Sequence, residues 1–344
     1  MVSALTNGRA REGYLKALCA FAEGAAVVVP PCSAAAALCV IALFADAQRR
    51  VARLGGREGM SRSIGSLYGG LVALFLGSTF RGRATRTFDM PHVGGLAITP
   101  DASALLVFHY DFYDDPAYVC RPDTGERLRK ISCGRNGGPL QFNSPSQVAI
   151  APDNFVYVAD LGNNRIQVLT PCFDFHSFIG VGQLHSPVGV CASQEIVAVS
   201  EPLENRISVF RRADGALLRR FGARGKSDGK LRAPQELCFL SNCSQIAVAD
   251  CHNHRVSVFT TEGAFVGHLG VGMLHHPTSV ACSAFGEVVI SDRNGSLVKL
   301  VVSDGCLTIA SVTYHPPGLR WLSGLAIHGN TIFAHTTEEC VVLT

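Results

Sequence analysis

From about Arg83 to its C-terminus, the chain is a succession of short apolar runs separated by turn-forming residues. Apolar and polar positions alternate within most runs, and β-branched residues are frequent, which is typical of β-strands. The runs recur in units marked by Pro145, Pro187, Pro234 and Pro277, which are spaced 42, 47 and 43 residues apart. A self-similar period of this length predicts a repeat architecture.

The unit that begins at Ser144 shows the internal pattern most clearly. It predicts four strands, at Gln147–Ala151, Phe155–Ala159, Arg165–Thr170 and Phe175–Ile179, with turns at the stretches PDN, DLGNN and TPC. Four short antiparallel strands of this kind form one propeller blade. A parallel α/β fold needs a long crossover, usually a helix, between its strands. The units leave no room for such helices.

The two ends of this region complete a ring. Residues 91–142 supply one more four-stranded unit, whereas the segment after Trp321 has only three strands. A blade that lacks a strand exposes an unpaired edge, so we expect Ala84–Pro91 to add the missing strand. The prediction for residues 84–344 is an all-β, six-bladed propeller of four-stranded antiparallel blades, closed by pairing of its N- and C-terminal strands.

An acidic residue followed five positions later by an arginine recurs at the turn between the second and third strands. A carboxylate at the end of a strand can accept hydrogen bonds from backbone N–H groups of the next turn. The arginine can donate a charge-assisted bond to that carboxylate or to neighbouring carbonyls. We therefore assign a structural role to the three pairs Asp160/Arg165, Glu201/Arg206 and Asp250/Arg255.

The frame D-x-x-N-x-R-[IV]-x-V-F resembles the NHL repeat. The match is strongest in NHRVSVF at Asn253–Phe259, and NNRIQVL and ENRISVF are similar to it. The resemblance covers Ser144–Gly270 and fades afterwards, since Leu297 stands where the arginine is expected. It implies a closed toroidal propeller, usually with six blades. Some members of the family bind RNA on a basic face, and others follow a RING, B-box and coiled coil in ubiquitin ligases. Because no Cys/His ligand array precedes residue 84, the resemblance does not imply ubiquitin-ligase activity for this chain.

Residues 1–83 differ from the rest and are predicted to form a separate apolar and basic N-terminal segment. Gly24–Ala45 and Ser63–Phe80 carry no charged residue, and each is close to the length that crosses a bilayer. Arginines between the two stretches favour the cytoplasmic side. Two interpretations of this segment stay open: a membrane anchor or targeting leader, with membrane contact through residues 24–80, and a poorly ordered or misassigned leader. The sequence does not identify the compartment, and the expectation is an intracellular protein that is either membrane-anchored or not.

Charge is distributed unevenly along the chain. Residues 1–80 contain eight Lys and Arg against four Asp and Glu, whereas residues 81–344 contain 22 against 23. The predicted propeller is therefore neutral, and a strongly nucleic-acid-binding domain is usually more basic. One passage between blades, RRFGARGKSDGKLRAP, is nevertheless rich in cations.

The basic passage and the second-to-third strand turns should lie on one face of the ring, and loop faces carry recognition. The binding candidates on this face are Arg224, Lys226, Lys230, Arg232, His252 and Asn253. They favour an acidic protein or peptide partner. Two alternatives stay open: nucleic acid, although aromatic residues for stacking are missing among the charges, and a solvated mobile loop without a partner.

Catalytic and metal-binding patterns are scarce. The chain has neither a G-x-S-x-G nor a G-x-x-x-x-G-K-[ST] stretch. Cys251, His252 and His254 occupy variable positions of the frame with no fourth ligand nearby, so no metal site is predicted. The thirteen cysteines include no C-x-x-C pair and are interpreted as free thiols. We expect a monomeric, non-catalytic scaffold without cofactors. The alternative is a metal-dependent hydrolase or lyase of the six-bladed type, with His275–His276 in its channel.

Overall fold

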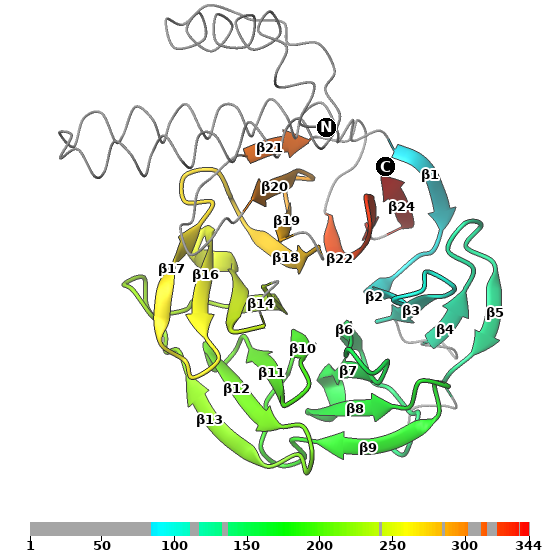
Figure 1. Ribbon diagram of the computed structural model, residues 1–344, viewed down its shortest axis with the longest axis horizontal. Helices are drawn as coiled ribbons and strands as arrows, with labels where there is room; N and C mark the ends of the chain where they lie inside the picture. The colour runs from blue at the N-terminus through cyan, green and yellow to red at the C-terminus, as the bar shows by residue number, and fades with distance from the viewer. Residues whose placement is uncertain are drawn as a thin grey trace, which may run out of the picture. The chain divides into compact units, whose positions relative to one another are not determined.

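A computed structural model describes residues 84–343, except 111–116, 133–136, 241–242, 284–285, 302–310, 315–321 and 337. The chain divides into two units, Met1–Thr79 and Phe80–Thr344, and every described residue belongs to the second. Within it the strands form six separate four-stranded antiparallel sheets arranged as the blades of a ring (Figure 1). The predicted all-β, six-bladed propeller is confirmed.

In blades 1 to 5 the four strands follow one another in the chain from the centre of the ring outwards (Figure 1). Blade 1 comprises β2 (Val93–Ile98), β3 (Leu105–His109), β4 (Ala117–Cys120) and β5 (Arg127–Lys130). Blade 2 comprises β6 (Pro145–Ile150), β7 (Val156–Asp160), β8 (Arg165–Leu169) and β9 (Phe175–Ile179). Blade 3 comprises β10 (Val190–Ala192), β11 (Ile196–Glu201), β12 (Arg206–Arg211) and β13 (Leu217–Phe221).

The second half of the ring repeats this order. Blade 4 comprises β14 (Pro234–Phe239), β15 (Gln245–Asp250), β16 (Arg255–Thr260) and β17 (Phe265–Leu269). Blade 5 comprises β18 (Pro277–Cys282), β19 (Glu287–Asp292), β20 (Leu297–Val301) and β21 (Ser311–Tyr314). Blade 6 comprises β22 (Ser323–His328), β23 (Thr331–His335) and β24 (Glu339–Leu343), and its fourth strand is β1 (Ala84–Asp89). β1 is antiparallel to β24, with Phe88 opposite Cys340.

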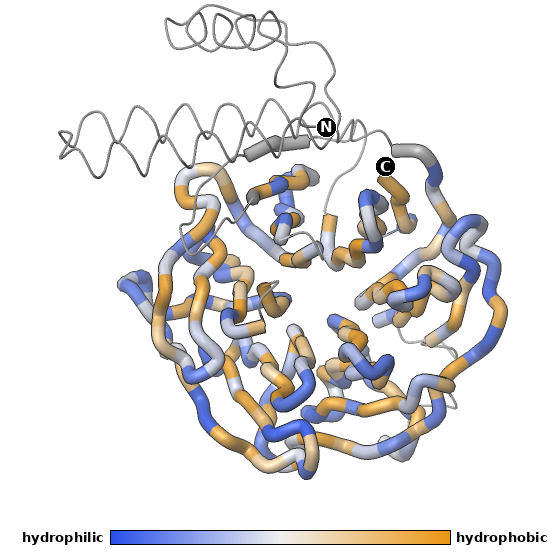
Figure 2. Tube along the Cα trace, viewed as in Figure 1, coloured by the Kyte–Doolittle hydropathy of each residue, from blue (hydrophilic) through white to orange (hydrophobic). Residues whose placement is uncertain are grey.

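The core lies between neighbouring blades. The middle strands are Val-, Ile- and Ala-rich and are buried on both faces, as in β7, where all five residues are buried. The outermost strands are more exposed, and all four residues of β5 are exposed. Figure 2 shows hydrophobic positions alternating with hydrophilic ones along the blades. Between blades 1 and 2, the rings of Phe108 and Phe142 pack edge to face with centroids 5.3 Å apart.

Several boundaries in blade 2 differ by one or two residues from the prediction, among them the start of β6 and the end of β7. β6 begins at Pro145, two residues before the predicted Gln147, because a proline can occupy the first position of a strand without donating to the ladder. β7 extends to Asp160, which lies opposite Arg165 in the β7–β8 ladder. The frame residues thus close the turn between these strands. Among the described residues no helix is long and apolar enough to cross a membrane. The predicted anchor at residues 24–80 lies outside them.

Candidate binding face

One face of the ring collects the second-to-third strand turns and the passages between blades, since both lie at the same ends of antiparallel strands. We call it the loop face. In blades 2 and 4 the turn is a short 3-10 helix, η1 (Leu161–Asn163) or η2 (Cys251–Asn253). Each is followed by a left-handed residue, Asn164 or His254. A conformation of this kind reverses the chain directly into the next strand.

The carboxylate of Asp250 is fully buried beneath the loop face of blade 4. It accepts hydrogen bonds from Arg255 Nε at 3.0 Å, Asn253 Nδ2 at 2.9 Å and the Ser257 hydroxyl at 3.0 Å. A further bond comes from the backbone N–H of Arg232 at 2.7 Å. Because a buried charge needs full compensation, this arrangement stabilises both the turn and the passage that precedes the blade.

Blade 2 repeats the network around Asp160, whose carboxylate accepts from Arg165 Nε at 2.8 Å and from Gln167 Nε2 at 2.9 Å. Blade 3 uses the longer Glu201, which pairs with Arg206 through two bonds of 2.9 Å. Burial opposes the ionisation of Glu201, but the bonds from Arg206 and Ser208 outweigh it and lower its pKa. The three pairs are therefore built into the interior of the blades.

The partners of the acids differ from the expectation in one respect. The backbone donors come from the passage before the blade, at Asn143, His185 and Arg232, rather than from the following turn. The arginine of blade 4 also reaches that passage, because Arg255 Nη2 donates to the carbonyls of Lys230 at 3.1 Å and Ser227 at 3.3 Å. Sequence spacing identifies the acid and the arginine but not a contact with a segment about twenty-five residues earlier.

Residues 222–233, which we call the basic passage, are held in a defined conformation. Arg224 forms a parallel bridge with Leu231, and the N–H of Gly225 donates to the Leu231 carbonyl at 3.1 Å. Leu231 itself is fully buried. Asn253 Nδ2 donates to the Gly225 carbonyl at 2.9 Å. Together with the bonds from Arg255, these contacts attach the passage to the turn of blade 4.

The cations of the basic passage point away from this framework. Arg224, Lys226 and Lys230 are exposed, and Arg232 is half-buried. Within the described part of the chain, none of these four side chains has a hydrogen bond or an ion pair. Asp228, the acid of the passage, interacts with His268, with 3.1 Å between Oδ1 and Nε2. The passage therefore presents uncompensated positive charge.

The two other binding candidates, His252 and Asn253, have different roles in the structure. The side chain of His252 is exposed on the loop face beside the basic passage, and its backbone N–H donates to the carbonyl of Arg232 at 3.1 Å. The side-chain amide nitrogen of Asn253, in contrast, is not available to a partner. Its amide nitrogen is bonded to Asp250 and Gly225, so it belongs to the structural network.

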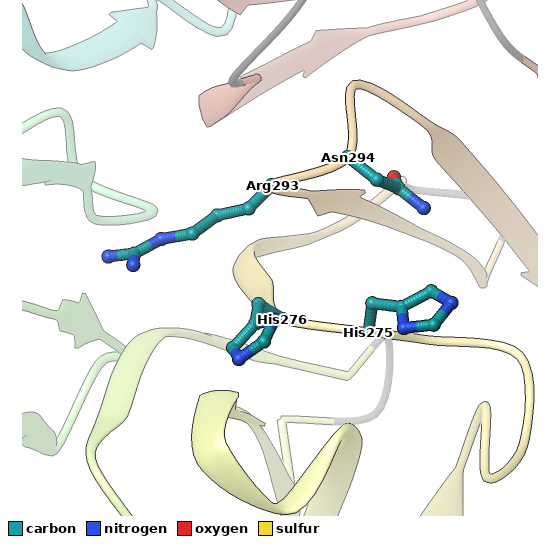
Figure 3. Close-up of a pocket in the computed structure, with 4 residues that line it drawn as sticks. All are labelled: His275, His276, Arg293 and Asn294. Carbon is teal, nitrogen blue, oxygen red and sulfur yellow. The ribbon is translucent and has the colours of Figure 1, made fainter.

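A pocket of about 500 Å³ opens on the same face at blade 5, where His275, His276, Arg293 and Asn294 line it. We call it the histidine pocket. In Figure 3 the side chains of His276 and Arg293 project to one side of it and those of His275 and Asn294 to the other. The two histidines precede β18 directly, and their N–H groups donate to Asp292 at 2.5 and 3.0 Å.

Blades 1 and 6 have histidine where the other blades have the acid. His109 ends β3, and its ring N–H donates to the carbonyl of Pro91 at 2.8 Å. His335 ends β23 and is buried, which lowers its pKa to about 4. A neutral imidazole cannot form the ion pair of the other blades. These positions therefore do not share the arginine network.

Comparison with known proteins agrees with this repeat geometry. The NHL repeat model matches residues 142–169, which contain β6, β7 and β8 and the complete Asp160 network. The chain therefore contains an NHL repeat within a six-bladed β-propeller. The earlier resemblance, drawn from the frame residues alone, is thereby confirmed.

Two curated relatives match part of this chain. Protein brain tumor of Drosophila melanogaster is 28% identical over 129 residues, which are 34% of this chain and 12% of that protein. RING finger protein nhl-1 of Caenorhabditis elegans is 38% identical over 77 residues, which are 21% of this chain and 8% of that protein. The matches thus span a small fraction of each relative.

Solved structures show the same fold at low identity. A chain of the nidogen/laminin complex has a TM-score of 0.54 at 18% identity, over 70% of this chain and 86% of that chain. A streptogramin B lyase has a TM-score of 0.55 at 10% identity, over 75% of this chain and 96% of that chain. At these identities the likeness concerns the fold alone. Within the described residues of this NHL propeller, no group of three or more His, Cys, Asp or Glu is arranged to hold a metal ion.

Proposed function

We propose that this NHL propeller is a non-catalytic, monomeric scaffold that binds an acidic protein or peptide segment through its loop face. The basic passage makes the principal contact. The observation that carries the proposal is the attachment of this passage to the buried Asp250 network through Asn253 and Arg255. A mobile loop would lose conformational entropy on binding, whereas a loop fixed in advance avoids much of that cost.

Charge complementarity supports an acidic partner. Arg224, Lys226 and Lys230 lie within seven positions of one another, are exposed, and have no compensating carboxylate among the described residues. Cations at the rim of an interface accelerate encounter with an acidic partner and select against basic ones. Because the network beneath them uses other side chains, changing these cations should leave the fold intact.

The test measures binding of a fluorescein-labelled Asp/Glu-rich peptide to the full chain by anisotropy at low salt. The variant Lys226→Glu/Lys230→Glu should weaken binding by about tenfold or more, since it turns two attractive charges into repulsive ones. The control is Arg121→Glu/Arg211→Glu, which makes the same change of net charge at exposed positions at the ends of the third strands of blades 1 and 3, on the opposite face, where each arginine pairs with an acid of the adjoining turn. This control should bind the peptide as the unaltered chain does. Salt at 0.5 M should reduce the difference between the two double variants, because exposed charges are screened.

Three results would contradict the proposal. Equal loss of binding in both double variants would show that net charge alone is responsible. Tighter binding of a single-stranded oligonucleotide than of the acidic peptide would favour nucleic acid instead. A stoichiometric transition metal in the purified protein, measured by elemental analysis, would favour the hydrolase or lyase alternative.

A further inference from the structure

The histidine pocket lies beside a second cluster of imidazoles. The rings of His254 and His276 pack edge to face with centroids 4.7 Å apart, and the centroids of His252 and His276 are 6.0 Å apart. Arg293 follows on the other side, where its backbone N–H donates to the carbonyl of His276 at 3.1 Å. Three imidazoles from two neighbouring blades thus lie together, and the charge of Arg293 is near enough to act on His276.

The backbone beneath these side chains is fixed. His254 is held by a bond of 3.2 Å from its N–H to the Cys251 carbonyl, and His252 by its bond to Arg232. The N–H groups of His275 and His276 are bound by the buried Asp292. The backbone that carries these side chains is therefore fixed before any ligand arrives.

The donors of the cluster are available. Within the described residues, the side chains of His252, His254, His276 and Arg293 have neither a hydrogen bond nor an ion pair. Asp292 is the carboxylate that faces His276, and it is occupied by backbone N–H groups, including that of Asn294 at 3.3 Å. A ligand that accepts several hydrogen bonds and carries negative charge would compensate the cluster.

We propose that His252, His254, His276 and Arg293 form a binding site for a phosphate monoester on a partner peptide. A phosphoserine or phosphothreonine carries a charge of roughly −1.5 to −2 and three acceptor oxygens. Three oxygens suit this group of donors better than the two oxygens of a carboxylate, and a guanidinium can contact phosphate through two parallel bonds. The site is continuous with the basic passage through the contact between His252 and Arg232.

Proton uptake should accompany binding. The pKa of His276 is lowered, chiefly because burial disfavours its charged form. The nearby His254, Arg293 and His252 lower this pKa further, and the carboxylate of Asp292 opposes them in part. A bound dianion would raise that pKa again, so the complex holds more protons than the free protein. By linkage, affinity for the phosphate increases as the pH falls from 8 towards 6.5. Below about pH 6 the phosphate itself takes up a proton and the gain ends.

The experiment compares three probes on the full chain by calorimetry: phenyl phosphate, an acidic peptide with one phosphoserine, and the same peptide with serine. The unaltered chain should bind the phosphopeptide about tenfold more tightly than the serine peptide. The single variants Arg293→Gln and His276→Gln should each remove that difference and leave the serine peptide unaffected. His185→Gln is the matched control, because this exposed loop-face histidine bonds Glu204 at 3.0 Å instead.

The outcomes separate this inference from the proposed function, on which its peptide part rests. Lys226→Glu/Lys230→Glu should weaken both peptides equally and leave phenyl phosphate binding unchanged. If phenyl phosphate binds but the serine peptide does not, the pocket stands and the acidic-peptide proposal fails. Equal affinity for the two peptides, an unchanged difference in Arg293→Gln, or affinity that is constant between pH 8 and 6.5 would overturn the phosphate site. Equal competition by a single-stranded oligonucleotide would assign it to nucleic acid.

Discussion

The buried acids of the blades provide a direct test of how the frame stabilises the ring. The substitution Asp250→Asn keeps the shape of the side chain and removes its charge. Arg255, which is only 9% exposed, would then lack its carboxylate partner, and the new amide nitrogen would face another donor. Loss of one partner of a buried ion pair costs about 3–5 kcal/mol, because the remaining charge stays buried.

Blade 5 offers the matched comparison. Asp292 is also fully buried, but Leu297 replaces the arginine, and its carboxylate accepts from backbone N–H groups of His275, His276 and Asn294. Asp292→Asn therefore leaves no buried cation without a partner. It leaves one N–H facing an amide nitrogen, which costs about 1–3 kcal/mol. The difference between the two substitutions, about 2 kcal/mol, estimates the contribution of the buried arginine.

Urea unfolding measures both free energies. Far-UV circular dichroism and tyrosine fluorescence should give coincident transitions under reducing conditions, which is the condition for a two-state treatment. At equal slopes, the shift of the midpoint gives the change in the free energy of unfolding. An Asp292→Asn variant that loses as much stability as Asp250→Asn, or more, would refute the reasoning, since the arginine would then make no difference.

Three further results are expected. Gly95→Ala should lower the melting temperature more than Gly182→Ala. A Cβ at Gly95 overlaps a carbonyl of blade 2, whereas at Gly182 it meets nothing within 4 Å and the cost is limited to the left-handed φ of +71°; equal losses would contradict this. Burial raises the pKa of Glu236 to about 8, above its value of 4.5 in the unfolded chain. Its stabilising contribution is therefore complete below pH 4.5 and lost as the pH rises through 8. Glu236→Gln should flatten this dependence in urea titrations at several pH values, and an unchanged profile would exclude the effect. Iodoacetamide should label Cys172 and Cys243, the exposed cysteines among the described residues, before the buried ones, as peptide mass spectrometry can determine; prior labelling of a buried cysteine would contradict the burial.

Much of the fold was predictable because its period is local. Each blade repeats within a little over forty residues, and the alternation of apolar positions marks its strands. The predicted β9 at Phe175–Ile179 agrees with the structure residue for residue. The three-residue β10 could not be predicted, because its shortening depends on contacts with neighbouring blades. Gly189, which precedes it, leaves space that the side chain of Leu237 on β14 occupies.

The candidate site was less predictable, since it depends on contacts distant in sequence. The cations of the basic passage were identified by charge alone. The attachment of that passage to Asn253 and Arg255 requires the ring to bring residues 225–230 next to a turn of the following blade. The grouping of His252 and His254 with His276 likewise arises between two blades. A sequence pattern that treats each repeat separately cannot show either arrangement.

The distribution of the complete frame suggests why these contacts matter. The full D-x-x-N-x-R set occurs in blade 2, after the passage at residues 131–144, and in blade 4, after the basic passage. In both, the asparagine and the arginine donate to passage carbonyls, as Asn163 and Arg165 do to Gln141 at 3.3 and 3.1 Å.

Blade 3 follows a shorter passage at residues 180–189, and Glu204 takes the place of the asparagine. There the described contacts of Arg206 are with Glu201 and Glu204 and do not include a passage carbonyl. Blade 5 follows the shorter passage at residues 270–276 and has no arginine at the frame position. A longer passage has more backbone carbonyls to satisfy. The complete frame therefore occurs where the passage before the blade is longer, and one of these two passages carries the cations of the loop face.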